Sequence, residues 1–520
     1  MRVLARRSDH PSRAKQAGRV MVSLALVTAL FAGAASCSRN PATGRLQFGL
    51  VSENDEVALG RKADEDIRKT LGVYDSKALS EMVTRVGTGL AAQSERPDLP
   101  WTFVVLDEPM VNAFALPGGW VYVTRGLLAH LGSEDELAAV LGHEAGHVTA
   151  RHGVVQLRKQ RAAQRSVGVF RIVDPNLRHV GGIAAATAGL ALLKHSREDE
   201  HEADDLGLRY LVKGGYNANA ITEMFGVLAQ VSAADDAEDV PPWLSTHPEP
   251  KLRQGRMASR ITEAGIAGSP VAADPKFLAA LDGMVFGADP RSGFFVGSTY
   301  VHPRRGFQID VPAGWEGQHS DDRILAASED ERSMFALGPS DAETAEAALD
   351  GFFEDGRLKP GEVWRGDVAG FHVESSAFTA GTEAQPLAGL VAFVDYDDGV
   401  VSMLALGDVE VWEDRLDSVA TAFASFAKIR SKQMREVKPM RLDLFTVPKP
   451  MTIVQVHEES RSVVDVETLA LINHATADET LAAGRVIKVV HGFNPERLAE
   501  VVGATEAKAA KSPASPPPPP

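Results

Sequence analysis

The sequence contains a single cysteine, Cys37, among its 520 residues. One cysteine excludes an intrachain disulfide and a thiolate metal cluster, so a metal ion in this chain must be bound by histidine and carboxylate. Basic residues are also scarce, because 54 Lys and Arg stand against 70 Asp and Glu, a formal net charge of −16. Phosphates bind where basic residues are in surplus, so this balance argues against nucleic acid as a partner. Hydrophobic residues at 44% and charged residues at 24% exclude a disordered or fibrous chain.

Long apolar runs are scarce, and the longest uncharged run near the N-terminus indicates an export signal. Six basic side chains fall within the first 19 residues, and Val20–Ala35 follows with 16 residues and no charge. A basic start, a short apolar run and an exit of small residues are typical of a secretory signal peptide, whereas a membrane-spanning helix needs about 20 apolar residues. The alternative is an uncleaved anchor helix.

The position of Cys37 at the end of that run is informative. Ala34-Ala-Ser-Cys37 resembles a bacterial lipobox, which implies cleavage before Cys37 and lipidation of its thiol. Serine, not aspartate, follows as residue 38, which favours sorting to the outer membrane. The resemblance therefore implies a periplasmic, lipid-anchored protein at the outer membrane of a Gram-negative bacterium.

The most informative pattern lies on a helix with a capped start. Ser133 can accept a hydrogen bond from an amide at the helix start, and the Glu136 carboxylate can accept one from the Ser133 amide, as in a capping box. The apolar helix that follows runs into His143-Glu-Ala-Gly-His147. This is the HExxH arrangement.

The spacing of this motif suits a metal ion. Residues i and i+4 share one helix face, so His143 and His147 can reach the same ion. Glu144 is placed to take a proton from a metal-bound water and not to bind the metal. Two neutral nitrogens suit zinc, which lowers the pKa of a bound water towards neutrality. Gly142 and Gly146 would let another element approach closely. The alternative is a surface helix with two solvated histidines.

A catalytic zinc ion needs a third protein ligand and one open position. The charged helical segment Ser196–Asp205 offers two glutamates, Glu200 and Glu202, as candidates for that third ligand. Either carboxylate would complete a ligand set of two nitrogens and one oxygen.

His143-Glu-Ala-Gly-His147 together with Glu200-His-Glu-Ala-Asp204 resembles metallopeptidase family forty-eight. The resemblance covers about residues 40–265 and implies a zincin-like, mostly helical domain with a small edge-strand sheet. It implies that Glu200 is the third ligand, with the other glutamate as its competitor. It also implies that Asp204, one turn further on, orients a ligand from outside the ligand set.

A further match implies a substrate-binding strand. Asn112-Ala-Phe-Ala-Leu-Pro-Gly-Gly119, followed by the alternating segment Trp120–Thr124, resembles the family's strand pair beside the active site. An exposed strand edge there would bind the substrate backbone as an added strand. The implied substrate-binding residues are Asn112, Ala113, Phe114 and Ala115.

Ser245-Thr-His-Pro248 also matches the family, and its histidine, His247, can occupy the open zinc position or stabilise the developing charge in catalysis. The alternative for His247 is capping of a helix predicted at Lys251–Ile261. The apolar run Val180–Leu193 has 14 residues, too few to cross a bilayer, and predicts a buried helix or a lid. The remaining nearby histidines are interpreted as bystanders: His152, His179, His195 and His201.

These features predict a zinc-dependent endopeptidase of the bacterial cell envelope, with one zinc ion per chain, that hydrolyses misfolded or misassembled envelope proteins. Glu144 accepts the proton of the zinc-bound water that attacks the peptide carbonyl, and passes it to the leaving amine. Polypeptide substrates and outer-membrane assembly machinery are the predicted partners. Two alternatives stay open: a chaperone-like assembly factor for outer-membrane proteins with a zinc site closed by His247, and a peptidoglycan-binding envelope protein.

The pattern changes beyond residue 266. Alternating strand and helix signals over 290–430 predict an α+β accessory domain. Residues 440–492 resemble a degenerate LysM module of strand, two helices and strand, which implies peptidoglycan binding. Pro450-Met451 stands where family members usually have Gly-Asp, so a packing role alone is the alternative. Residues 505–520 form a Pro-rich tail that cannot pack a core.

A chain of 520 residues is too long for one compact domain. The predicted fold class is α+β throughout. The predicted segments are a lipoprotein signal peptide (1–36), a tether (37–60), a zinc metallopeptidase domain (61–266), the accessory domain (290–430), the LysM-like module (440–492) and the disordered tail (505–520).

Overall fold

The computed structural model describes residues 37–40, 42–44, 46–48, 52–157, 195–234, 243, 246–320, 323–354, 358–382, 385–397 and 399–493. The predicted signal peptide, the apolar run 180–193, His179 and the Pro-rich tail lie outside these residues. The described residues combine helices with sheets whose strands pair mostly antiparallel, which agrees with the predicted α+β class. No described helix combines the length and apolar character needed to cross a lipid bilayer.

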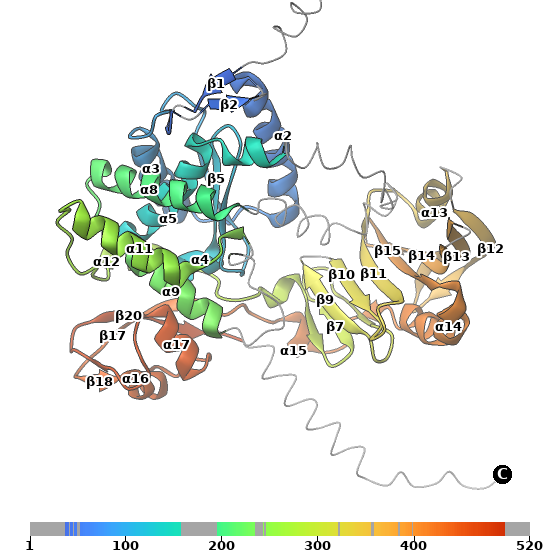
Figure 1. The fold of residues 1–520 in the computed structure, drawn as a ribbon. Helices are drawn as coiled ribbons and strands as arrows, with labels where there is room; N and C mark the ends of the chain where they lie inside the picture. Colours follow the sequence, from blue (N-terminus) through green and yellow to red (C-terminus); the bar gives the residue numbers. More distant parts are fainter. Residues whose placement is uncertain are drawn as a thin grey trace, which may run out of the picture.

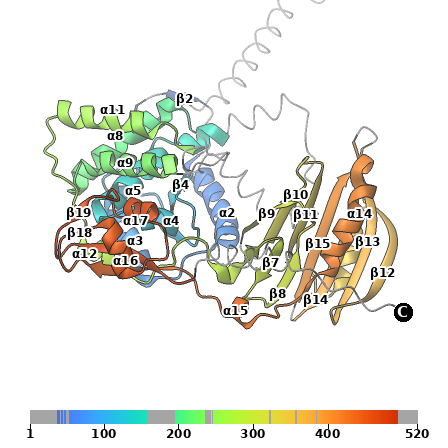
Figure 2. The ribbon, with the colours of Figure 1, turned by 90° about the horizontal axis from the view of Figure 1, so that it is seen from below.

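The described residues form three parts (Figure 1). We call residues 53–281 the helical lobe, residues 294–428 the sheet unit and residues 441–491 the C-terminal module. The helical lobe lies beside the sheet unit, and the C-terminal module packs against the underside of the helical lobe (Figures 1 and 2). The sequence-distant C-terminal module therefore contacts the lobe that carries the HExxH helix.

The helical lobe encloses a small three-stranded sheet. Its strand order is β3-β5-β4, with β3 parallel to β5 and β4 antiparallel to β5. Its helices are α2 (Glu53–Leu71), α3 (Lys77–Ala91), α4 (Arg125–His130), α5 (Glu134–Thr149), α8 (Arg197–Gly214), α9 (Ala220–Ala234), α11 (Pro250–Glu263) and α12 (Pro275–Leu281). Its strands are β3 (Thr102–Leu106), β4 (Ala113–Leu116) and β5 (Trp120–Thr124), and a short ladder of β1 (Cys37–Arg39) and β2 (Leu46–Phe48) precedes them.

Side-chain alternation places helices on both faces of this sheet. Phe114 and Tyr122 stack on one face, where α2 contributes Ile67 to the same apolar cluster. Ala113 and Val121 point to the opposite face and join the main core with α3 and α5. The turn between β4 and β5 carries two glycines, Gly118 and Gly119, at φ 86° and 108°, where only glycine is unstrained. The HExxH helix thus lies directly against the sheet.

The start of α5 matches its prediction in part. Ser133 Oγ accepts a hydrogen bond from the Glu136 amide at 3.2 Å, as predicted. The Glu136 carboxylate, however, accepts from the Gly132 amide at 2.6 Å instead of the Ser133 amide, so the expected capping box is not formed. The helix is therefore capped at Ser133 as predicted, but the Glu136 carboxylate binds the amide one residue before the cap.

The two helices that carry the metal-ligand motifs pack backbone against backbone. A Cβ atom added to Gly146 of α5 would lie 2.8 Å from the carbonyl oxygen of Ala203 in α8. A Cβ atom on Gly207 of α8 would lie 3.0 Å from the amide nitrogen of His143. The prediction that glycines on the HExxH helix allow a close approach is therefore confirmed.

The sheet unit is built around a seven-stranded antiparallel sheet of order β12-β13-β14-β15-β11-β10-β9 and a four-stranded sheet of order β16-β8-β7-β6. Its strands are β6 (Phe294–Val296), β7 (Thr299–His302), β8 (Phe307–Asp310), β9 (Glu316–Ser320), β10 (Arg323–Ala327), β11 (Ser333–Ser340), β12 (Lys359–Val368), β13 (Phe371–Thr382), β14 (Gln385–Tyr396), β15 (Gly399–Asp408) and β16 (Ala427–Lys428). Helix α13 (Ala345–Phe353) and helix α14 (Val409–Ala424) complete it, with η2 (Pro290–Ser292) before it and α15 (Lys432–Arg435) after it.

Alternation along β14 explains how the two helices of the sheet unit are arranged. Ala392 and Val394 share an apolar cluster with Phe423 of α14. Val391 and Phe393, one residue out of phase, share another cluster with α13. Because successive strand residues point to opposite faces, α13 and α14 cover opposite faces of the large sheet.

The C-terminal module contains two helices between two strands. Strands β17 (Arg441–Thr446) and β20 (Val486–His491) pair antiparallel, and helices α16 (Ile453–Ser460) and α17 (Val466–Ile472) lie between them in sequence, with a short ladder of β18 (Met451–Thr452) and β19 (Thr480–Leu481). Residues of this module and of the helical lobe form one continuous hydrophobic cluster. The module is therefore packed as part of the lobe and does not hang from it.

A buried lysine joins the C-terminal module to the helical lobe. Lys488 of β20 is 1% exposed, and its Nζ donates hydrogen bonds to the carbonyl oxygens of Ala129 and Leu131, both at 2.8 Å. These carbonyls end helix α4, where a cation is favourable. His474 Nε2 lies 2.6 Å from the carbonyl oxygen of His130 in the same place. Burial lowers the pKa of Lys488 to about 7.

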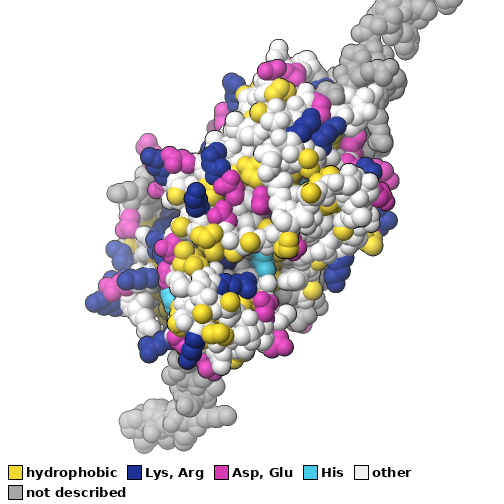
Figure 3. Space-filling model, turned by 90° about the vertical axis from the view of Figure 1, so that its left-hand side faces the viewer, with side chains coloured by type: hydrophobic (Ala, Val, Ile, Leu, Met, Phe, Trp, Pro, Cys, Tyr) yellow, Lys and Arg dark blue, Asp and Glu magenta, His cyan; other side chains and the backbone are white. Residues whose placement is uncertain are grey.

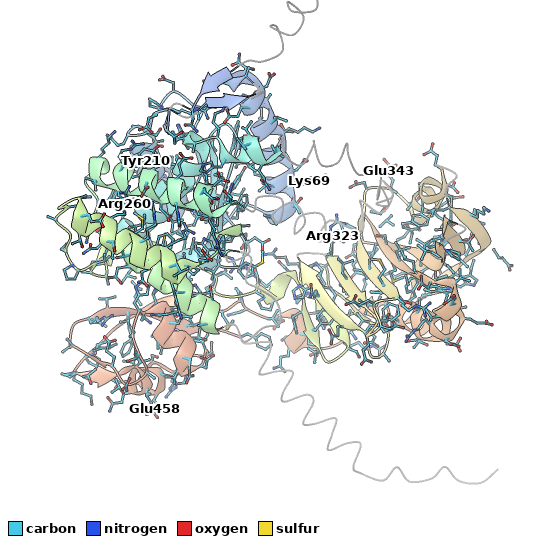
Figure 4. The ribbon with its side chains drawn as sticks, viewed as in Figure 1. Lys69, Tyr210, Arg260, Arg323, Glu343 and Glu458 are labelled. Carbon is cyan, nitrogen blue, oxygen red and sulfur yellow. The ribbon has the colours of Figure 1, made fainter. Side chains whose placement is uncertain are left out.

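Charged side chains of both signs are interspersed over the face drawn in Figure 3, and no large area of a single sign is visible there. Figure 4 places Tyr210 and Arg260 on the helical lobe and Glu458 on the part of the C-terminal module that points away from that lobe. Arg323 and Glu343 belong to the sheet unit.

Replacing Gly146 by alanine tests the close packing of α5 and α8. Alanine normally stabilises a helix interior by about 0.5–1 kcal/mol relative to glycine. At Gly146 the new methyl group meets the backbone of Ala203, so we expect a loss of about 1–3 kcal/mol in the free energy of unfolding. Chemical denaturation measures the free energy of unfolding of the wild type and of each variant. Gly255→Ala, on the open side of α11, is the matched control and should stabilise; equal stabilisation by both substitutions would contradict the packing argument.

Replacing Lys488 by methionine tests the docking of the C-terminal module. The folded pKa of about 7 lies below the ordinary value of 10.5, so the unfolded chain binds more protons between these two pH values. The wild-type free energy of unfolding should therefore rise from pH 7 to pH 10, by an amount on the order of a few kcal/mol. Lys488→Met should remove that rise. Lys449 is exposed, so Lys449→Met should keep the rise in the free energy of unfolding between pH 7 and pH 10. The same rise in Lys488→Met would contradict the burial of a titrating ammonium group.

Candidate metal centre

Three separate segments bring four potential metal ligands together. His143 and His147 extend from the same face of α5, Glu200 extends from the first turn of α8, and His247 precedes α11. One donor atom from each of these residues lies within 4.8 Å of the others. All four side chains are buried, with 1–3% of their surface exposed. The sequence-predicted ligands are thus adjacent in space.

The spacing of the donor atoms matches a tetrahedral metal site. His143 Nε2 lies 3.1 Å from His147 Nε2, and the Glu200 carboxylate oxygens lie 3.5 Å and 3.4 Å from these two nitrogens. His247 Nδ1 lies 3.4 Å from His143 Nε2. Metal–ligand bonds of 2.0–2.1 Å in tetrahedral geometry separate neighbouring ligands by about 3.3–3.4 Å. The donor set therefore fits a zinc-sized cation.

Glu200, and not Glu202, belongs to this group. The carboxylate of Glu202 lies 3.1 Å from His152 Nε2, on the other side of His147. Successive helix residues are rotated by about 100°, so two glutamates separated by two positions face different directions. The ambiguity that the sequence left between them is removed by the direction of α8.

Asp204 lies one helical turn beyond Glu200 and contacts His143. Its Oδ1 is 3.1 Å from His143 Nδ1, the ring nitrogen that points away from the ligand group. Asp204 is 0% exposed. A carboxylate in this place accepts a hydrogen bond from the Nδ1–H group and leaves the unprotonated Nε2 free to bind a metal.

An arginine that sequence reasoning missed completes the centre. Arg253 of α11 is 2% exposed and binds Asp204 through two nitrogens, Nη2 to Oδ1 at 2.6 Å and Nε to Oδ2 at 3.0 Å. Its Nη1 lies 2.6 Å from Glu200 Oε2. Arg253, Met257 and Ile261 recur at four-residue spacing and are all buried. A charged residue in an otherwise apolar helix stripe was the signal that could have identified it.

Opposing charges set the protonation of these groups. Burial and Arg253 oppose protonation of His143, but its hydrogen bonds with Asp204 and Glu200 outweigh them and raise its pKa to about 9. Burial holds the pKa of His147 well below its usual value, which favours a neutral imidazole. Burial would raise the pKa of Glu200, yet the charges of His247 and Arg253 hold it well below the usual value.

Glu144 is buried at the edge of the ligand group. It is 2% exposed, and its Oε1 lies 3.6 Å from His247 Nε2. Burial raises the pKa of Glu144, because a charged carboxylate loses solvation there. A carboxylate of raised pKa is suited to exchanging a proton with a reacting molecule.

His247 faces the ligand group and does not cap a helix. Its Nδ1 lies 3.0 Å and 3.1 Å from the two oxygens of Glu200. Helix α11 begins at Pro250 with Glu249 as its N-cap residue and has no side-chain cap. The alternative interpretation of His247 as a capping residue is therefore wrong.

Two histidines interpreted as bystanders contact the centre. His152 Nδ1 lies 2.9 Å from His147 Nδ1, and the His195 ring stacks on the His147 ring with a centroid distance of 4.0 Å. The sequence did not indicate these contacts: the turn after α5 returns His152 to His147, and His195 lies just before the start of α8. His201, by contrast, is exposed.

The predicted substrate-binding strand lies at an edge of the small sheet. Among the described residues, β4 pairs with β5 alone, and α5 packs beside it. Ala113 and Ala115 point towards the main core, whereas Phe114 points to the opposite face and stacks on Tyr122 at 4.8 Å. Asn112 is 1% exposed, and its Oδ1 has no hydrogen-bond partner among the described residues. A substrate contact by Phe114 would thus have to use its backbone.

A helix that presents two histidines, a nearby glutamate from a second helix and an adjacent carboxylate outside the ligand group defines the metallopeptidase class of site. The family model of peptidase family M48 matches residues 77–261, which contain this centre. A mitochondrial metalloendopeptidase OMA1 from Schizosaccharomyces pombe is 31% identical over 234 residues, 44% of this chain and 67% of that protein. The chain belongs to peptidase family M48, which confirms the family predicted from the sequence.

Other relatives match the same region. The mitochondrial metalloendopeptidase OMA1 of Arabidopsis thaliana is 34% identical over 214 residues, 40% of this chain and 42% of that protein. The beta-barrel assembly-enhancing protease of Escherichia coli K12 is 26% identical over 231 residues, 43% of this chain and 47% of that protein. The chain thus covers less than half the length of each of these two relatives. A solved structure of cyanobacterial PsbP from Synechocystis matches 25% of this chain and 91% of its own at 11% identity and a TM-score of 0.21, too low to support a conclusion.

Proposed function

We propose that the chain is a zinc-dependent endopeptidase of the bacterial cell envelope that hydrolyses peptide bonds in misfolded or misassembled envelope proteins. The observation that carries this proposal is the meeting of His143, His147 and Glu200 at tetrahedral ligand spacing, with Glu144 buried beside them. One zinc ion per chain would be held by these three side chains. Zinc bound there would polarise a peptide carbonyl and lower the pKa of water.

Glu144 is proposed to move the proton in this reaction. Its carboxylate takes a proton from the attacking water and delivers it to the leaving nitrogen of the cleaved peptide bond. Burial raises the pKa of Glu144, which brings its proton affinity closer to that needed for both steps. Asp204 and Arg253 orient His143 and Glu200, so that the ligand atoms keep their spacing.

The edge of β4 is the proposed binding site for an extended polypeptide. A strand added to this edge would pair with the backbone of Asn112, Ala113, Phe114 and Ala115, next to the helix that carries Glu144. Backbone pairing depends little on the side chains of the bound peptide, which suits an enzyme that cleaves unfolded chains of many sequences. This mode of binding would require the client to be extended and not folded.

The location and partners of the protein are proposed from its N-terminal sequence and its relatives. Cys37 is the proposed lipid attachment site after a signal peptide, which would hold the chain at the outer membrane within the periplasm. One relative is named a beta-barrel assembly-enhancing protease, and this supports contact with outer-membrane assembly machinery. Misassembled envelope proteins are then the clients within reach of the site.

Replacing Glu144 by glutamine tests the proposed reaction. Glutamine fills the same space but cannot take up a proton, so we expect casein cleavage to fall by roughly 100- to 10,000-fold. Zinc content, measured by metal analysis, should stay at one ion per chain. Glu134→Gln, at the partly exposed start of the same helix and paired with Arg85, is the matched control and should cleave casein normally. Cleavage by Glu144→Gln at the wild-type rate would show the assignment to be wrong.

A second candidate function is a chaperone-like assembly factor with a self-inhibited zinc site. It is favoured by the position of His247, whose Nδ1 lies 3.0 Å from Glu200 and 3.4 Å from His143 and so occupies the fourth corner of the ligand group. If Glu144→Gln still supports outer-membrane protein assembly in cells, the result would favour the assembly-factor role over the endopeptidase role.

Replacing His247 by alanine tests whether this residue closes the site. Removal of the imidazole opens the fourth corner to water and substrate, so we expect the rate of casein cleavage to rise. The rate is compared with wild type at equal zinc content. A fall in rate would instead assign His247 to stabilising the developing charge of the reaction.

Peptidoglycan binding by residues 440–492 remains a prediction. A pull-down with purified sacculi should use the full chain, because Lys488 and His474 bury part of the C-terminal module against the helical lobe. Retention of the chain by sacculi would support the glycan-binding interpretation, and no retention would favour a packing role.

A further inference from the structure

The chain reverses direction immediately after the HExxH helix, and distant residues hold this reversal. Helix α5 ends at Thr149, and Arg151 adopts a left-handed conformation with φ 61°, which costs a non-glycine residue about 1–2 kcal/mol. Asn40 Nδ2 donates to the Ala150 carbonyl at 2.7 Å. Arg151 Nη2 lies 2.8 Å from the carboxylate of Glu56, which is fully buried. These contacts offset the cost and return the next residue, a histidine, to the metal centre.

That histidine, His152, links His147 to a carboxylate. His152 Nδ1 lies 2.9 Å from His147 Nδ1, and His152 Nε2 lies 3.1 Å from Glu202 Oε2. Asp199 Oδ1 is 3.6 Å from the same His152 nitrogen. His147 and His152 are 3% and 4% exposed, so water does not compete for these contacts.

The chemistry of a metal ligand fixes where the protons lie in this chain of contacts. His147 Nε2 must be unprotonated to bind a metal, so its proton is on Nδ1. His152 Nδ1 therefore accepts a hydrogen bond from the His147 Nδ1–H group, and His152 Nε2–H donates one to the carboxylate of Glu202. The hydrogen bonds run in one direction, from His147 through His152 to Glu202.

The two metal-binding histidines are thus supported in different ways from the same helix. Asp204 of α8 contacts His143 Nδ1 directly at 3.1 Å. Glu202 of α8 points away from that face and reaches His147 only through the ring of His152. The acidic residues of α8 at positions 200, 202 and 204 therefore all act on one centre, although the middle one faces another direction.

A second metal ion between His147, His152 and His195 is the competing explanation, since their donor atoms lie within 4.8 Å of one another. Two observations oppose it. The Nδ1–Nδ1 distance of 2.9 Å is that of a hydrogen bond. The rings of His147 and His195 are stacked, with an interplanar angle of 25°, so their in-plane lone pairs do not converge on a point between them.

We propose that His152 and Glu202 are positioning residues that hold the Nδ1 proton of His147 and so aim its Nε2 at the metal. This inference rests on the proposed zinc site. The test is zinc affinity of the full chain, stripped of metal and titrated with zinc against a chromophoric chelator. His152→Ala should bind zinc about 10- to 100-fold more weakly than wild type.

Two further variants separate positioning from packing. His152→Phe fills the volume of the ring but cannot accept a hydrogen bond, whereas His152→Asn is smaller but keeps an acceptor near the place of Nδ1. Positioning predicts that His152→Asn recovers part of the zinc affinity and that His152→Phe does not. The reverse order would overturn the proposal.

His201→Ala is the matched control, because His201 is an exposed histidine on the helix that carries Glu202, and it should bind zinc as wild type does. If His152→Ala fails to fold, Glu202→Ala carries the test, with weaker zinc binding expected. Zinc affinity of His152→Ala within twofold of wild type would overturn the inference, as would two zinc ions per wild-type chain and one in His152→Ala. A wild-type chain that binds no zinc would instead reject the proposed function.

Discussion

The metal centre depends on a backbone contact between α5 and α8. Helices usually pack with their axes 8–10 Å apart, according to the side chains between them. Here Gly142 and Gly146 face Ala203 and Gly207, so that added methyl groups would meet the other helix at 2.8–3.0 Å. Ala203 lies on the same helical turn as Glu200. The small residues that bring the helices together therefore also fix how deeply the carboxylate reaches between the two imidazoles.

Burying so many ionisable groups is favourable only if their charges balance. Glu144, Glu200 and Asp204 supply three carboxylates, and Arg253 supplies one guanidinium. All four side chains are at most 2% exposed. Metal binding requires neutral imidazoles, and in that form the three carboxylates and one guanidinium leave two excess negative charges, which one divalent cation would neutralise. Arg253 has a second effect, because its fork binds Asp204 through two nitrogens and prevents that carboxylate from turning towards the metal position. Removing one partner of such a buried pair typically destabilises a protein by about 3–5 kcal/mol.

The parts of the centre that sequence could predict are those encoded on one helix or in a known pattern. The spacing of His143 and His147 follows from helix geometry, and the position of Glu200 followed from the family resemblance. His152 was not predicted, because its contacts with His147 and Glu202 depend on the turn after α5 and on the direction of α8. Arg253 was not predicted, because its partners lie on another helix, although its place in a buried apolar stripe was a signal for it. The same limit applies to the fold: the strand and helix signals over 290–430 predicted an α+β unit, but the order of the seven strands and the shared core of the C-terminal module depend on contacts between distant residues.

Residues of the N-terminal segment contact the end of the HExxH helix and so affect the geometry of the metal centre. Asn40 and Glu56 lie within the segment predicted as a tether, yet they are 1% and 0% exposed and bind the end of the HExxH helix. Arg96 joins them, because it contacts Glu56 and donates to the Val148 carbonyl of the same helix. A segment that begins three residues after the proposed lipid attachment site thus braces the turn that presents His152 to His147. A change in this segment would act on the metal centre through that turn, without contacting metal or substrate.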